Sequence, residues 1–281
     1  KGTPSFEFQH LNSQFHILDR INDVEFSRDF NLTQEFNQIT QNRLIFSFLN
    51  TWKNQSFFNY KINYLDEKNS YRGIKNDLDF GFIKGKFKTK GNFSYLDTKA
   101  TFQNTKFVRS GIISEFTTKK GSWAIGGNLE HNVKTFNATQ LLDVSSFSWK
   151  EAFLQKKIGD STRTKLAAKV YLRQNDSVRN NSLENMNHIL GIVVESQIIK
   201  TEKTTLNALI HYRKFSYQNQ DISTKFNQDF VVGNVLYNQQ LFRNGMRLQA
   251  FYELGNGQEA QREFQYIKVT DGQGIYKWTD Y

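Results

Sequence analysis

Cysteine is absent from this 281-residue chain, and proline occurs once, at Pro4. The lack of cysteine excludes disulfide bonds, zinc–thiolate sites and thiol nucleophiles. The lack of proline leaves a backbone N–H at nearly every position, which suits continuous hydrogen-bonded strands. The composition is even from end to end, so the length favours one large all-β domain over two average soluble domains.

Long apolar runs are also missing. The nearest one, His188 to Ile199, is interrupted by Gly191 and Glu195, whereas a membrane-spanning helix needs about 18 consecutive apolar residues. The sequence therefore predicts no transmembrane helix. It begins without Met and without a signal peptide, so we expect either a processed chain or a segment of a longer protein.

Positive charge is in excess, with a formal net charge of +10. Lys and Arg are scattered singly among other residues, as in KGKFKTKGNF from Lys84 to Phe93. This scatter favours the wetted face of a sheet over a nucleic-acid surface, which would concentrate its cations. We therefore expect no nucleic-acid partner. The alternative to a merely wetted sheet face is a surface that attracts anionic lipid or polysaccharide.

Alternation of apolar and polar residues dominates the chain and predicts β-strands, because successive side chains of a strand point to opposite faces. A helix would instead need apolar residues at intervals of three and four. The clearest apolar sets are Phe58, Tyr60, Ile62 and Tyr64; Leu78, Phe80 and Phe82; Trp123, Ile125 and Leu129; Leu166, Ala168, Val170 and Leu172; Leu206, Ala208, Ile210 and Tyr212; and Leu248, Ala250, Tyr252 and Leu254.

Connections between these tracts alternate in predicted length. If each strand pairs with the next, the short turns fall on one edge of the sheet and the long loops on the other, which is the layout of outer-membrane barrels. Short turns are predicted at 53–55, 85, 119–121, 159–161, 200–203, 243–245 and 271–274, and long polar loops at 66–72, 97–106, 134–146, 174–184, 218–227 and 255–262.

The pattern predicts an all-β, antiparallel up-and-down transmembrane β-barrel of about 14 to 16 strands, or part of a larger barrel. Residues 1–40 are expected to supply an N-terminal strand or docking segment, and residues 41–281 the barrel.

In such a barrel Leu248, Ala250 and Tyr252 would face lipid, while Arg247 and Gln249 would face a wet lumen. Expected interface aromatics are Tyr64, Trp123, Tyr212, Tyr237 and Tyr252. The competing hypothesis is a soluble sandwich or curved sheet with the apolar face packed inward.

Chemical motifs are scarce. The histidines, His10, His16, His131, His188 and His211, have no metal-ligand spacing. GxSxG and phosphate-binding loops are absent, and the glycines of 255–257 and 272–274 are typical of turns. We therefore predict no catalytic residue, no metal ligand and no cofactor, and we do not expect an enzyme; a serine triad assembled across strands is the alternative.

Two charged stretches remain. Asp77 and Asp79 share a strand face with Lys75, and Lys86, Lys88 and Lys90 share a face of the next strand, so cross-strand ion pairs are expected, with a pore-selectivity ring as the alternative. The stretch Leu18 to Leu32 is rich in both signs; it is interpreted as a solvated connection, a first strand, a docking segment or a plug inside the lumen.

The stretch FYELGNGQEAQREFQYIKVTDGQGIYKWTDY, Phe251 to Tyr281, together with VEFSRDFNL, Val24 to Leu32, resembles a family of large β-rich surface proteins of Bacteroidota, seldom assigned a function. More remotely, the long polar-faced strands are similar in texture to the translocon barrel of the type nine secretion apparatus. These resemblances imply an outer-membrane scaffold or conduit in surface assembly, secretion or transport in a Gram-negative bacterium. Its expected partners are outer-membrane lipid, lipopolysaccharide and other outer-membrane or periplasmic proteins. A soluble or peripheral protein that binds polysaccharide, lipid or a partner barrel is the alternative.

Overall fold

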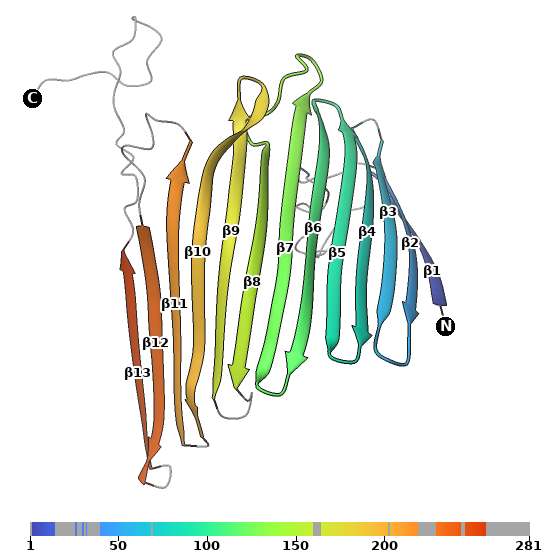
Figure 1. The fold of residues 1–281 in the computed structure, drawn as a ribbon. Coiled ribbons are helices and arrows are strands. Elements are labelled where there is room, and N and C mark those ends of the chain that lie inside the picture. Colours follow the sequence, from blue (N-terminus) through green and yellow to red (C-terminus); the bar gives the residue numbers. More distant parts are fainter. Residues whose placement is uncertain are drawn as a thin grey trace, which may run out of the picture.

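A computed structural model describes residues 2–14, 26, 30, 32, 40–68, 70–159, 164–201, 203–218, 229–242 and 245–256. These residues form one antiparallel sheet of 13 strands, in which every strand pairs with its neighbours in sequence (Figure 1). The strands are β1 (Gly2–Leu11), β2 (Gln41–Thr51), β3 (Phe57–Glu67), β4 (Tyr71–Lys84), β5 (Phe87–Ala100), β6 (Gln103–Thr118), β7 (Gly121–Phe136), β8 (Phe147–Gly159), β9 (Lys165–Arg179), β10 (Ser182–Lys200), β11 (Thr204–Tyr217), β12 (Asp229–Leu241) and β13 (Met246–Asn256).

The all-β, antiparallel, up-and-down order predicted from the sequence is confirmed. Among the described residues the sheet is open, since β1 and β13 are its two edges and lie far apart (Figure 1). The predicted turn at 271–274 and most of the predicted loop at 255–262 lie outside the described part of the chain, as does most of Leu18 to Leu32.

The sheet has two faces of opposite polarity. One face carries the predicted apolar tracts, and we call it the apolar face. The register places Phe58 opposite Phe80. It also places Leu154 between Ile125 on one neighbouring strand and Val170 on the other. The other face, the polar face, carries rows of Asn, Lys, Asp, Glu and Arg, such as Asn59, Asp79, Asn92, Gly111, Asn128, Glu151 and Arg173, which are opposed in turn from β3 to β9.

The predicted facing of β13 is confirmed at the level of the sheet. Leu248, Ala250 and Tyr252 lie on the apolar face, opposite Gln239, Tyr237 and Val235, while Arg247 and Gln249 lie on the polar face. All five predicted interface aromatics lie on the apolar face as well: Tyr64, Trp123, Tyr212, Tyr237 and Tyr252.

Three of the predicted long loops are wrong. Residues 66–72, 97–106 and 174–184 are mostly strand, and their connections shrink to 68–70, 101–102 and 180–181. Their polar residues continue the strands beyond the apolar tracts, where composition alone suggests a loop. Asn180 and Asn181 both have positive φ, 49° and 60°, which is the conformation of a two-residue hairpin turn and one that Asn adopts readily. The loops at 137–146 and 218–228 remain long.

The connections divide between two edges. Strands β1, β3, β5, β7, β9 and β11 end at the upper edge in Figure 1, and β2, β4, β6, β8, β10 and β12 end at the lower edge. The lower connections are all two to five residues long, whereas the predicted long loops of the upper edge are equally short at 68–70, 101–102 and 180–181. Hydrogen bonds join neighbouring connections at the upper edge. Thr101 N donates to the Ser70 carbonyl (3.1 Å), the Asn137 side chain donates to the Ala100 carbonyl (2.7 Å), and Leu142 N donates to Asn181 Oδ1 (2.6 Å).

Aromatic rings on one strand repeatedly cover a glycine on the next. Phe57 lies against Gly81, Phe153 against Gly126, and Tyr171 against Gly191, each ring directly opposite its glycine on the polar face. A Cβ at Gly191 would come within 2.0 Å of the Tyr171 ring. Such pairs fill the space that a missing side chain leaves and allow a sheet to curve.

Replacement of Gly191 by Ala is expected to destabilise the fold by about 1–3 kcal/mol, because the added methyl group must displace the buried Tyr171 ring. The matched control is Gly255→Ala on the same face, since no atom lies within 4 Å of the position that its Cβ would take. The midpoint of urea unfolding, followed by circular dichroism, measures both. Equal unfolding midpoints for the two variants would show that the packing of the Tyr171 ring does not require glycine at position 191.

Candidate functional site

The polar face is covered at its upper end by two residues of the β1–β2 connection. Phe26 and Phe30 are buried in a cluster with Leu65, Tyr71, Leu96 and Phe107, which belong to β3, β4, β5 and β6. The Tyr71 hydroxyl donates to the Phe30 carbonyl (2.6 Å), and Phe30 N donates to the Phe26 carbonyl (3.0 Å), the spacing of one helical turn. This contact is the main apolar core of the described chain, and it ties a predicted solvated connection to the sheet.

Arg43 adds a polar contact to the same cluster. Its guanidinium carbon lies 5.0 Å from the centre of the Phe26 ring, within the range of a cation–π interaction. Its Nε also donates to Asn63 Oδ1 (3.2 Å) on β3. The sequence signal for this cover is the spacing of Phe26 and Phe30 within a charged stretch, which places both rings on one side of a helical turn.

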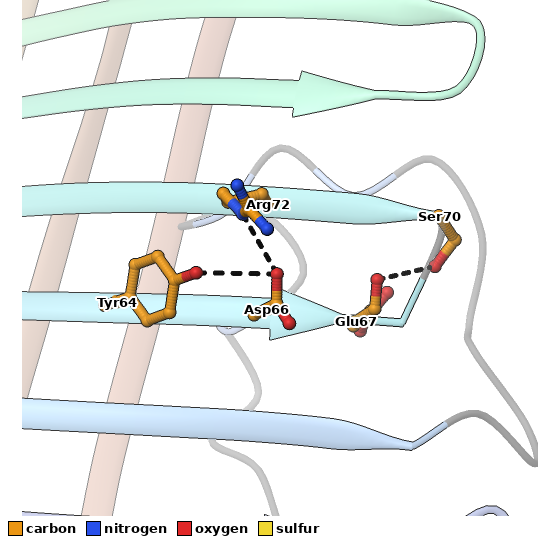
Figure 2. A network of polar contacts seen from close by, with 5 residues as sticks. All are labelled: Tyr64, Asp66, Glu67, Ser70 and Arg72. Carbon is orange, nitrogen blue, oxygen red and sulfur yellow. Dashed lines mark hydrogen bonds and ion pairs between the residues drawn. The ribbon is translucent and has the colours of Figure 1, made fainter.

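The β3–β4 corner beside the cover is closed by polar contacts (Figure 2). Arg72 Nε forms an ion pair with Asp66 Oδ1 at 3.0 Å, and the Tyr64 hydroxyl donates to the same oxygen at 3.4 Å. The Ser70 hydroxyl donates to the Glu67 carbonyl (3.4 Å). Tyr64, Asp66 and Arg72 lie on the apolar face, above the apolar tract of β3, so a polar border ends that tract here.

Glu67 is a buried carboxyl at this corner, on the polar face and beyond the apolar tracts. It is 3% exposed, and its Oε2 has no hydrogen-bond partner among the described residues. Burial, with a smaller effect from the Asp66 charge, raises the pKa of Glu67 to about 7. The side chain therefore changes charge near neutral pH, next to the strand that carries Tyr71.

A second group of contacts crosses β9, β10 and β11 on the polar face. The Tyr171 ring passes over Gly191 of β10, and its hydroxyl forms a hydrogen bond with His211 Nε2 of β11 at 2.9 Å. Glycine is required at this position, because any side chain would occupy the space of the ring. The sequence gives no signal of this pair, since Tyr171 and His211 are 40 residues apart.

Charged and aromatic side chains pair off beside this group. Lys169 Nζ lies 2.8 Å from Glu151 Oε1 and 4.3 Å from the centre of the Phe153 ring. The Arg173 guanidinium lies 4.0 Å from the centre of the Trp149 ring, whose Nε1 donates to Glu130 Oε2 (3.3 Å). The charges of Lys169, Glu151 and Arg173 therefore each have a partner of opposite sign or an aromatic ring.

The polar face is hollowed over its centre. A space of about 670 Å³ is lined by residues from β2, at Leu49, to β8, at Phe153. Since strands that far apart border one hollow, the polar face is concave here. The amide oxygens of Asn92 and Asn128 converge over Gly111, 2.7 and 2.9 Å from the position of a Cβ there. The hollow thus has a floor of hydrogen-bonding groups.

The four described histidines do not form one site. His211 belongs to the polar-face contact with Tyr171, and His131 and His188 lie on the apolar face. His10 Nδ1 is 2.7 Å from Asn42 Oδ1, and His188 Nε2 is 2.7 Å from Asn185 Nδ2. His16 lies outside the described residues. Within the described ranges no three His, Asp or Glu side chains gather in a way that could hold a metal ion.

The predicted charge cluster is brought together in part. Lys75, Asp77 and Asp79 share the polar face of β4, and Lys75 Nζ lies 3.3 Å from Asp77 Oδ2, so this ion pair joins neighbours on one strand. Lys88 and Lys90 lie on the polar face of β5, opposite Ile83 and Gly81 rather than opposite the carboxylates. The predicted shared face is wrong for Lys86, which lies in the turn between the strands.

No helix in the described part of the chain is long and apolar enough to cross a membrane. No protein-family model matches the sequence, and no curated protein matches it. The sheet and its two faces are therefore the basis for any statement on function.

The Glu67→Gln variant is expected to be more stable than the parent protein above pH 7, by up to about 3 kcal/mol, and equally stable near pH 4. The folded-state pKa of Glu67, about 7, lies above that of the unfolded chain, so the parent loses stability as the pH rises from about 4.5 to about 7. Unfolding in urea across this pH range measures the difference.

Glu7→Gln on β1 is the matched control, because Glu7 is an exposed carboxyl on the same face. If the free energy of unfolding of the Glu67→Gln variant changes with pH as that of the parent protein does, the buried carboxyl does not titrate in this range.

Proposed function

We propose that this chain forms an outer-membrane β-barrel, or a large part of one, in a Gram-negative bacterium, and acts as a scaffold or conduit in surface assembly, secretion or transport. The proposed role is structural or conductive rather than enzymatic. Its proposed partners are outer-membrane lipid, lipopolysaccharide and other outer-membrane or periplasmic proteins.

One observation carries the proposal: the sheet exposes its apolar face and buries much of its polar face. On the apolar face Phe6, Ile125 and Leu172 are each more than 60% exposed, whereas on the polar face Asn63, Asn132 and Asn187 are 6% exposed or less. Water would oppose this arrangement, because contiguous exposed apolar surface of this extent is rare on soluble monomers. A hydrocarbon solvent around the apolar face favours it.

The ends of the apolar tracts support the same proposal. Tyr64 with Asp66 and Arg72 at the upper border, and Trp123 with Lys156 at the lower border, combine aromatic rings with charges. Amphipathic rings and long basic side chains favour the boundary between hydrocarbon and headgroups. The concave polar face, with its paired charges and amide-lined hollow, suits a wet interior.

A soluble or peripheral sheet that binds polysaccharide, lipid or a partner barrel through its aromatic face is the second candidate. The observation that favours it is the open sheet of the described residues, whose strands β1 and β13 each have one unpaired edge. Unpaired edges invite pairing with another chain.

Membrane fractionation followed by gel mobility with and without boiling separates the two candidates. The barrel proposal predicts a β-rich species in the outer-membrane fraction that needs detergent to leave it and whose mobility changes only on boiling. Recovery in the soluble fraction without detergent, with no change in mobility, would contradict it. Circular dichroism on both fractions controls for unfolded protein.

A further inference from the structure

The lower edge of the sheet carries a marked excess of cations. Within four residues of its turns, the one described carboxylate is Glu115, whereas twelve Lys and Arg side chains are described there. They are Lys53, Lys84, Lys86, Lys88, Lys90, Lys119, Lys120, Lys165, Lys203 and Arg247, which are exposed, and Lys156 and Lys157, which are half-buried. In the sequence, the same turns and their flanks also contain Asp160, Arg163, Lys200, Glu202 and Arg243. We call this set of described cations the basic rim.

The upper edge has no such excess. Within four residues of its connections, nine described cations are interspersed with seven described carboxylates, and Arg72 is paired with Asp66. The cations are Arg43, Lys68, Arg72, Lys99, Lys106, Lys134, Lys150, Arg179 and Lys214. The carboxylates near the upper connections are Asp66, Glu67, Asp97, Asp143, Asp176, Glu184 and Asp229. The net positive charge of the chain is therefore concentrated at one end of its strands.

The basic rim borders the exposed apolar face. Lys84 lies directly opposite Phe87, which is 57% exposed, and Phe87 in turn packs against Phe116 with ring centres 4.9 Å apart. Lys156 Nζ lies 4.3 Å from the centre of the Trp123 ring on the next strand. Lys84 and Lys156 thus lie where the apolar surface ends, as cations do at the headgroup level of a bilayer.

We propose that the basic rim binds the phosphate groups of anionic phospholipid headgroups in the leaflet at the lower edge of the sheet. The proposal rests on the membrane placement proposed above and names a partner for this edge. Basic side chains near an anionic membrane surface are each attracted to it, and here they follow the lower edge of the sheet from the β2–β3 turn to β13, with Lys84 and Lys156 on the apolar face itself. An acidic peptide would instead need its contacts gathered in one place.

Energy transfer from tryptophan to a labelled lipid tests the proposal on the full chain. Trp52 and Trp123 lie at or near the lower edge. The protein is reconstituted into phosphatidylcholine vesicles that contain a trace of dansyl-labelled phosphatidylglycerol or, in parallel, dansyl-labelled phosphatidylcholine. The ratio of the two transfer signals gives the preference for the anionic headgroup, and unboiled gel mobility verifies folding in each sample.

Two variants with equal loss of charge are compared. The rim variant is Lys84→Gln, Lys86→Gln, Lys119→Gln and Lys120→Gln; the control is Lys68→Gln, Lys99→Gln, Lys106→Gln and Lys150→Gln, at exposed positions toward the upper edge. The parent and the control are expected to prefer phosphatidylglycerol by roughly tenfold, and the rim variant to lose most of that preference. About 1 M salt should abolish it, because the Debye length falls to about 3 Å.

Three results would count against the proposal or its basis. Equal transfer to both lipids in the folded parent protein would overturn the basic rim as a phosphate site and leave the barrel proposal intact. A preference that the upper-edge control loses as strongly as the rim variant would also overturn it, since net charge alone would then explain the effect. Failure of the parent protein to enter any vesicle would instead contradict the membrane placement.

Discussion

The structure depends on one constraint, the antiparallel register that joins the 13 described strands. Because side chains alternate with a period of two, a slip of one residue in any pair would move a whole strand's apolar set to the other face. The register opposes Phe58 to Phe80 and Ile125 to Leu154, and it opposes Asn92 to Asp79. Two faces of opposite polarity follow directly. Where the register shifts, within β10 at Asn185/Asn187 and at Gln197/Ile199, the irregularity lies toward a strand end.

Curvature is built from pairs of large and absent side chains. Phe57 against Gly81, Phe153 against Gly126 and Tyr171 against Gly191 all lie on the polar face, so ring and glycine together fill the concave side without crowding it. Tyr171 goes further and reaches His211 on the second strand away. The same geometry that lets the sheet bend therefore also connects its polar side chains, and it brings residues from β2 to β8 around one hollow.

The two edges of the sheet differ in kind. Hydrogen bonds between neighbouring connections and mixed charges hold the upper edge together, and Phe26 and Phe30 cover the polar face below it. The lower edge has short turns and exposed lysines. This difference gives the sheet a direction along its strands. A protein with such an axis suits a membrane whose two leaflets differ, which is the setting proposed for this chain.

The sequence by itself determined most of the strands, their antiparallel order and the common face of the apolar tracts, because alternation is a local property that a strand displays in full. Leu248, Ala250 and Tyr252 could be assigned to one face from eight residues of context. The tertiary structure decided what depends on distant partners: that polar residues 97–106 continue two strands, that Phe26 and Phe30 pack against β3 to β6, and that Tyr171 meets His211. It also decided where the charge lies. Lysines that are scattered along the chain become one rim, because every second connection of an up-and-down sheet returns to the same edge.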